Sequence, residues 1–273
     1  MPSYQKPSNL AIVSSLMMSA GLPVLHAQEP AATNKTSNKI GAVEANPADG
    51  PEADADQLSE LKKINATTYQ LGEFTIDKKQ RTISFEAETE ITKEIIEYAI
   101  VTPAGKIHES LFITNARPIH FNIAFKLLGY KENKSLYKVF VNNFPTNKNQ
   151  PATDEEKTKS FFTTTISWTD KETKKTHHHN INELIMNVQT EKTMASNKAK
   201  WSYGGSFIHQ GKFVAEMNND LIAIFTDRGA VANYAGDGRE DDTLWFPITE
   251  KMPVKGTKVT ITITPDFPAD KKK

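Results

Sequence analysis

Val259-Thr260-Ile261-Thr262-Ile263-Thr264 is the stretch of sequence that decides the fold. Three aliphatic residues alternate with three threonines, and a period of two is typical of a strand that buries one face. The same alternation places Phe162, Thr164, Ile166 and Trp168 on one face, and it recurs over residues 82–87. The sequence therefore predicts a protein rich in half-buried strands.

Further strands are predicted on the N-terminal side of this stretch, at residues 95–101, 107–113, 136–141, 201–209 and 221–225. The turn Pro103-Ala104-Gly105-Lys106 separates the first two of them and predicts a hairpin. Apolar residues recur on one helical face over residues 118–128, where Gly129 ends the helix, and a second short helix is predicted at residues 181–188. Strands with two interspersed helices predict an α+β fold built on a mostly antiparallel sheet.

The N-terminus has the outline of a secretory signal peptide over residues 1–27. Lys6 gives a positive start, Leu10–Leu25 is uncharged and largely apolar, and Ala27 offers a small residue for cleavage. The alternative is a retained membrane anchor, which the short apolar run and Pro23 disfavour. We expect a secreted or periplasmic protein of the cell envelope.

The rest of the chain is predicted to hold one domain. Residues 28–66 are rich in Ala, Pro, Asn and acidic residues and indicate a flexible linker. Residues 67–268 form the predicted domain, and residues 269–273 are a basic tail. The length of this domain is ordinary for a single hydrophobic core.

Composition excludes several classes of function. The 273 residues include 33 basic and 33 acidic side chains, so the formal net charge is zero. Charge therefore gives no reason to expect nucleic acid as a partner, and none to expect a membrane apart from the one that the export signal crosses. Cysteine is absent, which rules out an iron–sulfur cluster held by Cys, thiolate catalysis and Cys-type zinc sites. No cofactor is predicted, while a divalent metal held by His and carboxylates stays open.

Several segments together resemble a known family, and they are Tyr98–Leu111, Lys126–Gly129, Trp201–Phe207 and Asp241–Trp245. In this order they resemble the YdjY-type domain of exported proteins from planctomycete-like bacteria, a family without a characterised function. The resemblance covers residues 69–265, and His108-Glu109-Ser110-Leu111 after the Gly-Lys turn is its most specific part. The ferredoxin-like description of the family's namesake implies an iron–sulfur protein, which a chain without cysteine does not support.

His108-Glu109-Ser110 is the first candidate site. In a strand His108 and Ser110 share one face, where they can form a base and a nucleophile, while Glu109 takes the other face. Nucleophilic serines usually occupy a sharp turn, so hydrogen bonding at a strand edge is the alternative. The zinc-protease pattern fails because Phe112 stands where a second histidine is needed.

Two other segments are candidate cation sites. His177 and His179 fall on one face of a predicted strand and can chelate a divalent ion, although Lys174 and Lys175 indicate an exposed arm. Residues 237–242 hold four carboxylates, including Asp241 and Asp242, and can form a calcium loop or a plain solvated loop.

Aromatic residues and glycines supply the last candidate. Trp201 and Tyr203 can form a platform for a sugar or peptide, or can pack in the core. Gly204, Gly205 and Ser206 follow them, and glycines in a strand mark a bulge or a close backbone approach, sometimes by a ligand. Trp245 closes the last segment of the family resemblance and is counted with this group.

These observations favour a non-catalytic binding or structural accessory module of the periplasm or cell envelope. Its partner would be an envelope component or a small ligand of unknown identity. The alternative is a metal-dependent or serine-type hydrolase that uses His108, Glu109 and Ser110 together with Asp241 or Asp242.

Overall fold

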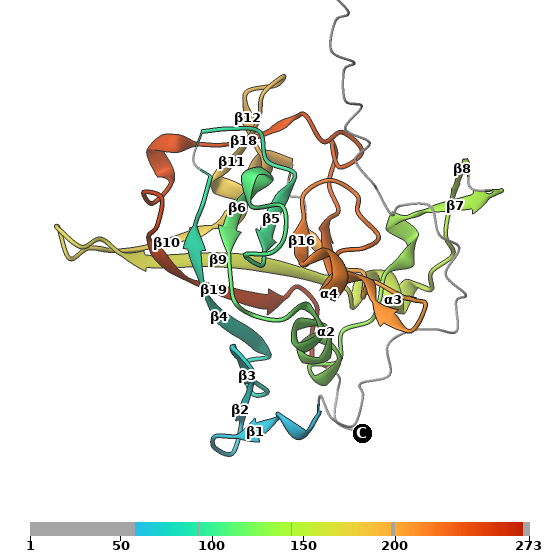
Figure 1. The fold of residues 1–273 in the computed structure, drawn as a ribbon, viewed down its shortest axis with the longest axis horizontal. Helices are drawn as coiled ribbons and strands as arrows, with labels where there is room; N and C mark the ends of the chain where they lie inside the picture. The colour runs from blue at the N-terminus through green and yellow to red at the C-terminus, as the bar shows by residue number, and fades with distance from the viewer. Residues whose placement is uncertain (1–57, 92, 143, 198–199, 270–273) are drawn as a thin grey trace, which may run out of the picture. The chain divides into compact units, whose positions relative to one another are not determined.

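The computed structural model describes residues 58–91, 93–142, 144–197 and 200–269 (Figure 1). The predicted signal peptide, the basic tail beyond residue 269 and most of the predicted linker lie outside these ranges, so they stay predictions. Within the described ranges, no helix combines the length and the apolar character that crossing a bilayer requires.

Eight strands close into a barrel. Its order is β4-β19-β9-β13-β17-β16-β5-β6, and β6 pairs back with β4 through Glu88 opposite Ile113 and Thr89 opposite Phe112. Six of the eight pairings are antiparallel, while β16–β17 and β5–β6 are parallel. The strands are β4 (Thr82–Thr89), β5 (Tyr98–Val101), β6 (Ser110–Ile113), β9 (Phe161–Thr169), β13 (Trp201–Tyr203), β16 (Asp220–Ala223), β17 (Ala232–Tyr234) and β19 (Lys258–Pro265).

The predicted α+β fold, a mostly antiparallel sheet with two interspersed helices, is wrong, because the domain is mostly β and its sheet closes into a barrel. The α-helices of the described ranges are α2 (Pro118–Leu127), α3 (Asp154–Thr158) and α4 (Val214–Asn218). Only α2 matches a predicted helix. Residues 181–188 instead form the 3₁₀ turn η3 (Ile181–Glu183), capped by the Asn180 side chain, and the strand β11 (Ile185–Asn187).

The predicted hairpin between residues 95–101 and 107–113 is also wrong. After the turn the chain forms the 3₁₀ helix η1 (Ile107–Glu109), and β6 then runs parallel to β5 with Tyr98 opposite Ser110. Ile107 packs against a small second cluster of buried residues, namely Tyr98, Val101, Ala223 and Ala230. Burial of this aliphatic side chain favours a path across the sheet instead of an immediate return beside β5.

Shorter strands extend the barrel or pair beside it. The run β1 (Lys62–Lys63), β2 (Thr68–Leu71) and β3 (Phe74–Asp77) leads antiparallel into β4, and β10 (Thr176–Asn180) pairs with the end of β9. Separate small sheets are formed by β7 (Lys138–Val141) with β8 (Phe144–Asn149), by β12 (Lys192–Thr193) with β11 and β18 (Trp245–Pro247), and by β14 (Ile208–His209) with β15 (Lys212–Phe213). The remaining 3₁₀ helices are η2 (Lys134–Leu136), η4 (Met194–Asn197) and η5 (Thr249–Lys251).

The core confirms the alternation seen in the sequence. Val259, Ile261 and Ile263 are buried, and they belong to the same hydrophobic cluster as Ile83 and Phe85 on the paired strand β4. Helix α2 is buried along most of its length, and its Phe121 stacks on Phe74 at 5.2 Å between ring centroids. Figure 1 shows α2 beside α4, and the two helices are in contact. The barrel therefore has one continuous apolar core that fixes its strands in place.

Candidate functional site

Four polar side chains meet where β5 and β16 lie side by side, and we call them the Asp220 cluster. Tyr98 begins β5, Lys106 precedes η1, Asp220 begins β16, and Asp227 lies in the loop after β16. These elements are neighbours because β16 pairs with β5, and β5 pairs with the strand that follows η1. Residues more than a hundred positions apart in the sequence are thus brought to one place.

Tyr98 is the centre of the cluster. Its hydroxyl donates a hydrogen bond to Asp227 Oδ2 at 3.1 Å and accepts one from Lys106 Nζ at 2.5 Å. Burial raises the pKa of Tyr98 far above its usual value, and the carboxylates of Asp227 and Asp220 raise it further. Tyr98 is therefore a neutral phenol that can donate and accept at the same time.

Asp220 is the unusual member. Its side chain is fully buried, and neither carboxylate oxygen has a hydrogen-bond partner. Burial, and then the neighbouring Asp227, raise the pKa of Asp220 to about 8, while Lys106 opposes the shift. A buried carboxyl without partners is costly for a fold, and such perturbed groups are concentrated at functional sites.

A second layer of hydrogen bonds holds Asp227 in position. Asn233, buried on β17, accepts from the Asp227 backbone N–H at 2.7 Å and donates to the Tyr137 hydroxyl at 3.0 Å. The Tyr137 hydroxyl lies against Gly204, where any Cβ would collide with it. Gly204 and Gly205 indicated that some group approaches the backbone closely here. At Gly204 that group is the side chain of Tyr137, which belongs to the protein itself.

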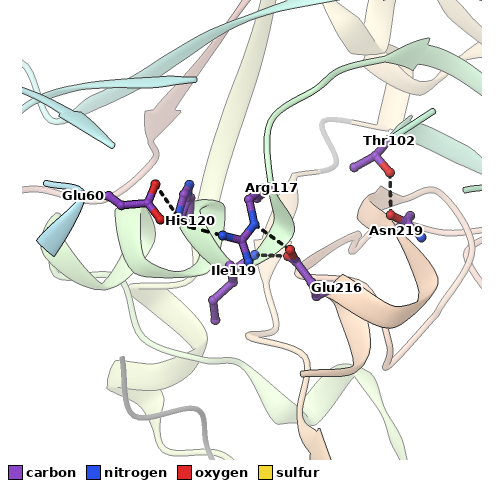
Figure 2. A network of polar contacts seen from close by, with 7 residues as sticks. All are labelled: Glu60, Thr102, Arg117, Ile119, His120, Glu216 and Asn219. Carbon is purple, nitrogen blue, oxygen red and sulfur yellow. Dashed lines mark hydrogen bonds and ion pairs between the residues drawn. The ribbon is translucent and has the colours of Figure 1, made fainter. Parts of the chain in front are cut away.

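Figure 2 shows the network that fixes the start of β16. Glu216 on α4 accepts from Arg117 Nε at 2.7 Å and from the Ile119 backbone N–H at 3.0 Å, at the N-terminus of α2 where a carboxylate is favoured. Thr102 donates to Asn219 Oδ1 at 2.7 Å, and Asn219 directly precedes Asp220. These contacts fix residues 216–219, which directly precede the buried carboxyl of Asp220.

A second region, the Trp168 cleft, lies at the β9–β10 hairpin. Its volume is about 640 Å³, and it is lined by Trp168, His177 and His179 with the turn 169–172 and the segment 250–257. The His177 ring is stacked on Trp168 at 4.9 Å between centroids, and the His179 ring at 5.4 Å. The two imidazoles lie side by side at 6.3 Å, so both cover the same indole.

The sequence profile of the YdjY domain family matches residues 74–264, a span that includes both regions. The chain belongs to the YdjY domain family. This confirms the family resemblance noted from the sequence. The match carries no information on the source organism of the chain or on its export. No curated protein and no solved structure shows significant similarity to the chain.

In this YdjY domain the His108-Glu109-Ser110 element lies beside the Asp220 cluster. Ser110 is buried and donates its hydroxyl hydrogen to the Lys106 carbonyl at 2.6 Å, whereas the His108 side chain is 75% exposed and lies 3.4 Å from Glu109. A serine committed to a backbone carbonyl is poorly placed as a nucleophile. Glu109 contributes in another way, because its negative charge helps to raise the pKa of Asp220.

The predicted cation sites lie on β10 and in the loop before β18. His177 and His179 do lie together, and His179 Nδ1 is 3.5 Å from Glu183. Asp241 accepts from the backbone and hydroxyl of Thr243, an arrangement that closes a turn, and Arg239 lies 3.4 Å from Glu240. Among the residues described, no three His, Asp or Glu side chains are grouped so that they could hold a metal. A divalent-ion site at His177 and His179 stays a prediction, and so does a calcium loop with Asp241 and Asp242.

The aromatic candidates of the YdjY domain are buried. Trp201 donates to Asn182 Oδ1 at 2.7 Å, and Tyr203 donates to Asn122 Oδ1. Ser206 donates to the Gly229 carbonyl, and Trp245 is closed off in the same core as Trp201. Aromatic side chains with almost no exposure to solvent cannot form a platform for a ligand, so the positions of Trp201, Tyr203 and Trp245 favour a structural role.

The four residues of the Asp220 cluster were missed as site candidates. Asp220 precedes the apolar run Leu221–Phe225, and a lone charge at the start of a fully buried strand was the available signal. Tyr98 and Lys106 lie in a segment of the family resemblance, but nothing in the sequence joined them to Asp220, because only the pairing of β16 with β5 brings them together.

Proposed function

We propose that this YdjY domain is a non-catalytic binding module of the periplasm or cell envelope, and that its ligand binds in the Trp168 cleft. The observation that carries the proposal is the cleft itself. Its volume of about 640 Å³ is in the range of small-molecule sites, and ring faces and charged groups line it together. The hydrolase alternative has no comparable support, because Ser110 is buried and bonded to a carbonyl.

The lining of the cleft indicates the chemistry of the ligand. The imidazoles of His177 and His179 offer ring faces, which favour a flat ring or a sugar ring on the ligand. Charged residues of both signs surround them, namely Lys171, Lys251, Lys255, Asp170, Glu172 and Glu250. A short peptide or an oligosaccharide with ionised groups fits this combination, and the cell envelope is rich in both.

Fluorescence titration of the folded domain with short charged peptides and amino-sugar oligomers tests the proposal. Trp201 and Trp245 are almost fully buried, so we expect Trp168 emission to report on the cleft. A ligand should change that emission with saturation, and a His177→Ala/His179→Ala variant should bind at least about tenfold more weakly. His178→Ala is the matched control, since His178 lies between them on the exposed, opposite face of β10.

The proposal about the cleft fails if the double variant binds every active ligand as tightly as the natural chain. Export is tested separately, with residues 1–66 fused to a reporter enzyme that is active only outside the cytoplasm. We expect activity from this fusion and its loss in Leu16→Arg, which places a charge inside the apolar run. Reporter activity that is absent in both fusions would overturn the envelope location.

A further inference from the structure

Lys106 places an ammonium group in an aromatic corner of the Asp220 cluster. The rings of Tyr98 and Phe225 meet at 89° with centroids 5.4 Å apart. Lys106 Nζ lies 4.6 Å from the Tyr98 centroid and 5.9 Å from the Phe225 centroid. Two perpendicular rings around one ammonium group form a cation–π site, and this one also contains the Tyr98 hydroxyl.

Lys106 lies near Asp220 but does not pair with it. Asp227 and Glu109 raise the pKa of Asp220, whereas Lys106 lowers it. Lys106 Nζ is bonded to Tyr98, and both oxygens of the buried Asp220 lack a hydrogen-bond donor. An ammonium group has three donors, so one that reached Asp220 would satisfy the carboxylate that Lys106 leaves without a partner.

Lys106 can leave the corner at small structural cost. It is partly exposed, and it stands at the turn before η1, so its long side chain can rotate into water without any change in the strands. Its departure breaks one hydrogen bond, to Tyr98, and frees the space between the two rings.

We propose that the Asp220 cluster is a binding site for a primary ammonium group of a ligand. The ligand enters the space between Tyr98 and Phe225 that Lys106 leaves and, because it is not tethered to the backbone as Lys106 is, reaches Asp220 and forms an ion pair with it. The ligand class is a small alkylammonium, a polyamine, or the side chain of a lysine on another protein. A metal ion is disfavoured, because no group of three or more suitable side chains occurs among the described residues. A quaternary ammonium is disfavoured as well, since it has no N–H to give to Asp220.

Calorimetric titration with n-butylammonium tests the proposal on the natural chain, Lys106→Ala and the double variant Lys106→Ala/Asp220→Asn. The titrations are run at pH 9, which is above the pKa of about 8 that Asp220 has in the natural chain and at which the probe is still protonated. We expect Lys106→Ala to bind the probe at least about tenfold more tightly than the natural chain, because its own ammonium no longer competes. Replacing Asp220 in addition should remove that gain.

Controls separate this site from the cleft and from misfolding. Tetramethylammonium should not bind to Lys106→Ala, and His177→Ala/His179→Ala should bind n-butylammonium like the natural chain, because those residues belong to the other site. Near-ultraviolet circular dichroism verifies that each variant is folded. The proposal is overturned if neither the natural chain nor folded Lys106→Ala binds n-butylammonium, or if the double variant binds it as tightly as Lys106→Ala. If putrescine and a lysine-containing peptide bind differently, the comparison identifies which source of ammonium the site prefers.

Discussion

The Asp220 cluster and the Trp168 cleft both gather ionisable side chains around aromatic rings, but they differ in their access to water. In the cluster the carboxyl of Asp220 is fully buried and has no hydrogen-bond partner. In the cleft His177 and His179 are partly exposed and lie on an indole that forms the floor. The first region carries an electrostatic cost in the folded state, whereas the second is open and carries almost none.

This difference has a structural origin. The cleft is built by one hairpin, β9–β10, with the segment 250–257 across from it, so its chemistry is local. The cluster exists only because β16 pairs with β5, a strand more than a hundred residues earlier in the chain. We therefore expect changes in the cluster to affect the whole fold, and changes in the cleft to affect ligand binding with little effect on stability.

The largest expected effect is on the pH dependence of stability. The pKa of Asp220 is raised from its unfolded value near 4 to about 8, so the native state binds the extra proton between these values. Stability contributed by this group is then full below about pH 4, falls as the pH rises, and is lost by about pH 8. The total change for a four-unit shift is on the order of 5 kcal/mol.

Asp220→Asn should remove that slope. Urea unfolding at pH 5 and pH 8 measures it, and the variant should lose several kcal/mol less than the natural chain between the two pH values. Curves with the same pH dependence for both proteins would show that Asp220 is solvated or paired in solution, and the contrast between the two regions would then disappear.

Many strands of the barrel could be predicted from the sequence, but the closure of the barrel could not. The alternation in β19 and β9 and the apolar face of α2 predicted these elements, because side-chain period follows directly from which face is buried. The closing contact between β4 and β6 involves two pairs of opposed residues, and the parallel path through η1 depends on the packing of Ile107. Neither leaves a periodic pattern in the chain.

The two regions also differ in how far the sequence could predict them. His177 and His179 are two residues apart, so a sequence alone suggests that they share a face. Asp220 and Lys106 are separated by more than a hundred residues, and only the pairing of β16 with β5 joins them. Sequence reasoning finds sites that one element makes and misses those made by the pairing of strands that are distant in the chain.

The second largest effect concerns the support of the cluster. Gly204→Ala places a Cβ against the Tyr137 hydroxyl, which also binds Asn233, and Asn233 in turn holds Asp227. We expect a loss of about 1–3 kcal/mol in the free energy of unfolding, as for other overpacked sites. Tyr137→Phe in the same chain should recover part of that loss by removing the colliding oxygen. Additive costs in a double-mutant cycle would mean that the two side chains are not in contact.

A smaller effect is expected in the cleft. His177→Ala removes the ring that is stacked on Trp168, and aromatic pairs contribute about 0.5–1.5 kcal/mol. The loss of stability should stay within that range, while acrylamide quenching of Trp168 should increase because the indole becomes more exposed. His178→Ala should change neither quantity. A loss of unfolding free energy as large as that of Gly204→Ala would show that the cleft contributes to the stability of the fold as strongly as the cluster does.

The smallest effect is expected on removal of metal ions. Two imidazoles that lie side by side on an indole offer two ligands, and the described residues provide no third His, Asp or Glu grouped with them to hold an ion. Two ligands without a supporting shell bind divalent ions weakly, and weak binding gives little stabilisation through mass action. A melting curve with chelator should therefore match the curve without it to within about 1 °C. Stoichiometric metal in the purified domain, with a loss of several degrees on chelation and none in His177→Ala/His179→Ala, would instead make the cleft a metal centre. That result would reverse the contrast, because the open region would then also contribute to the stability of the fold.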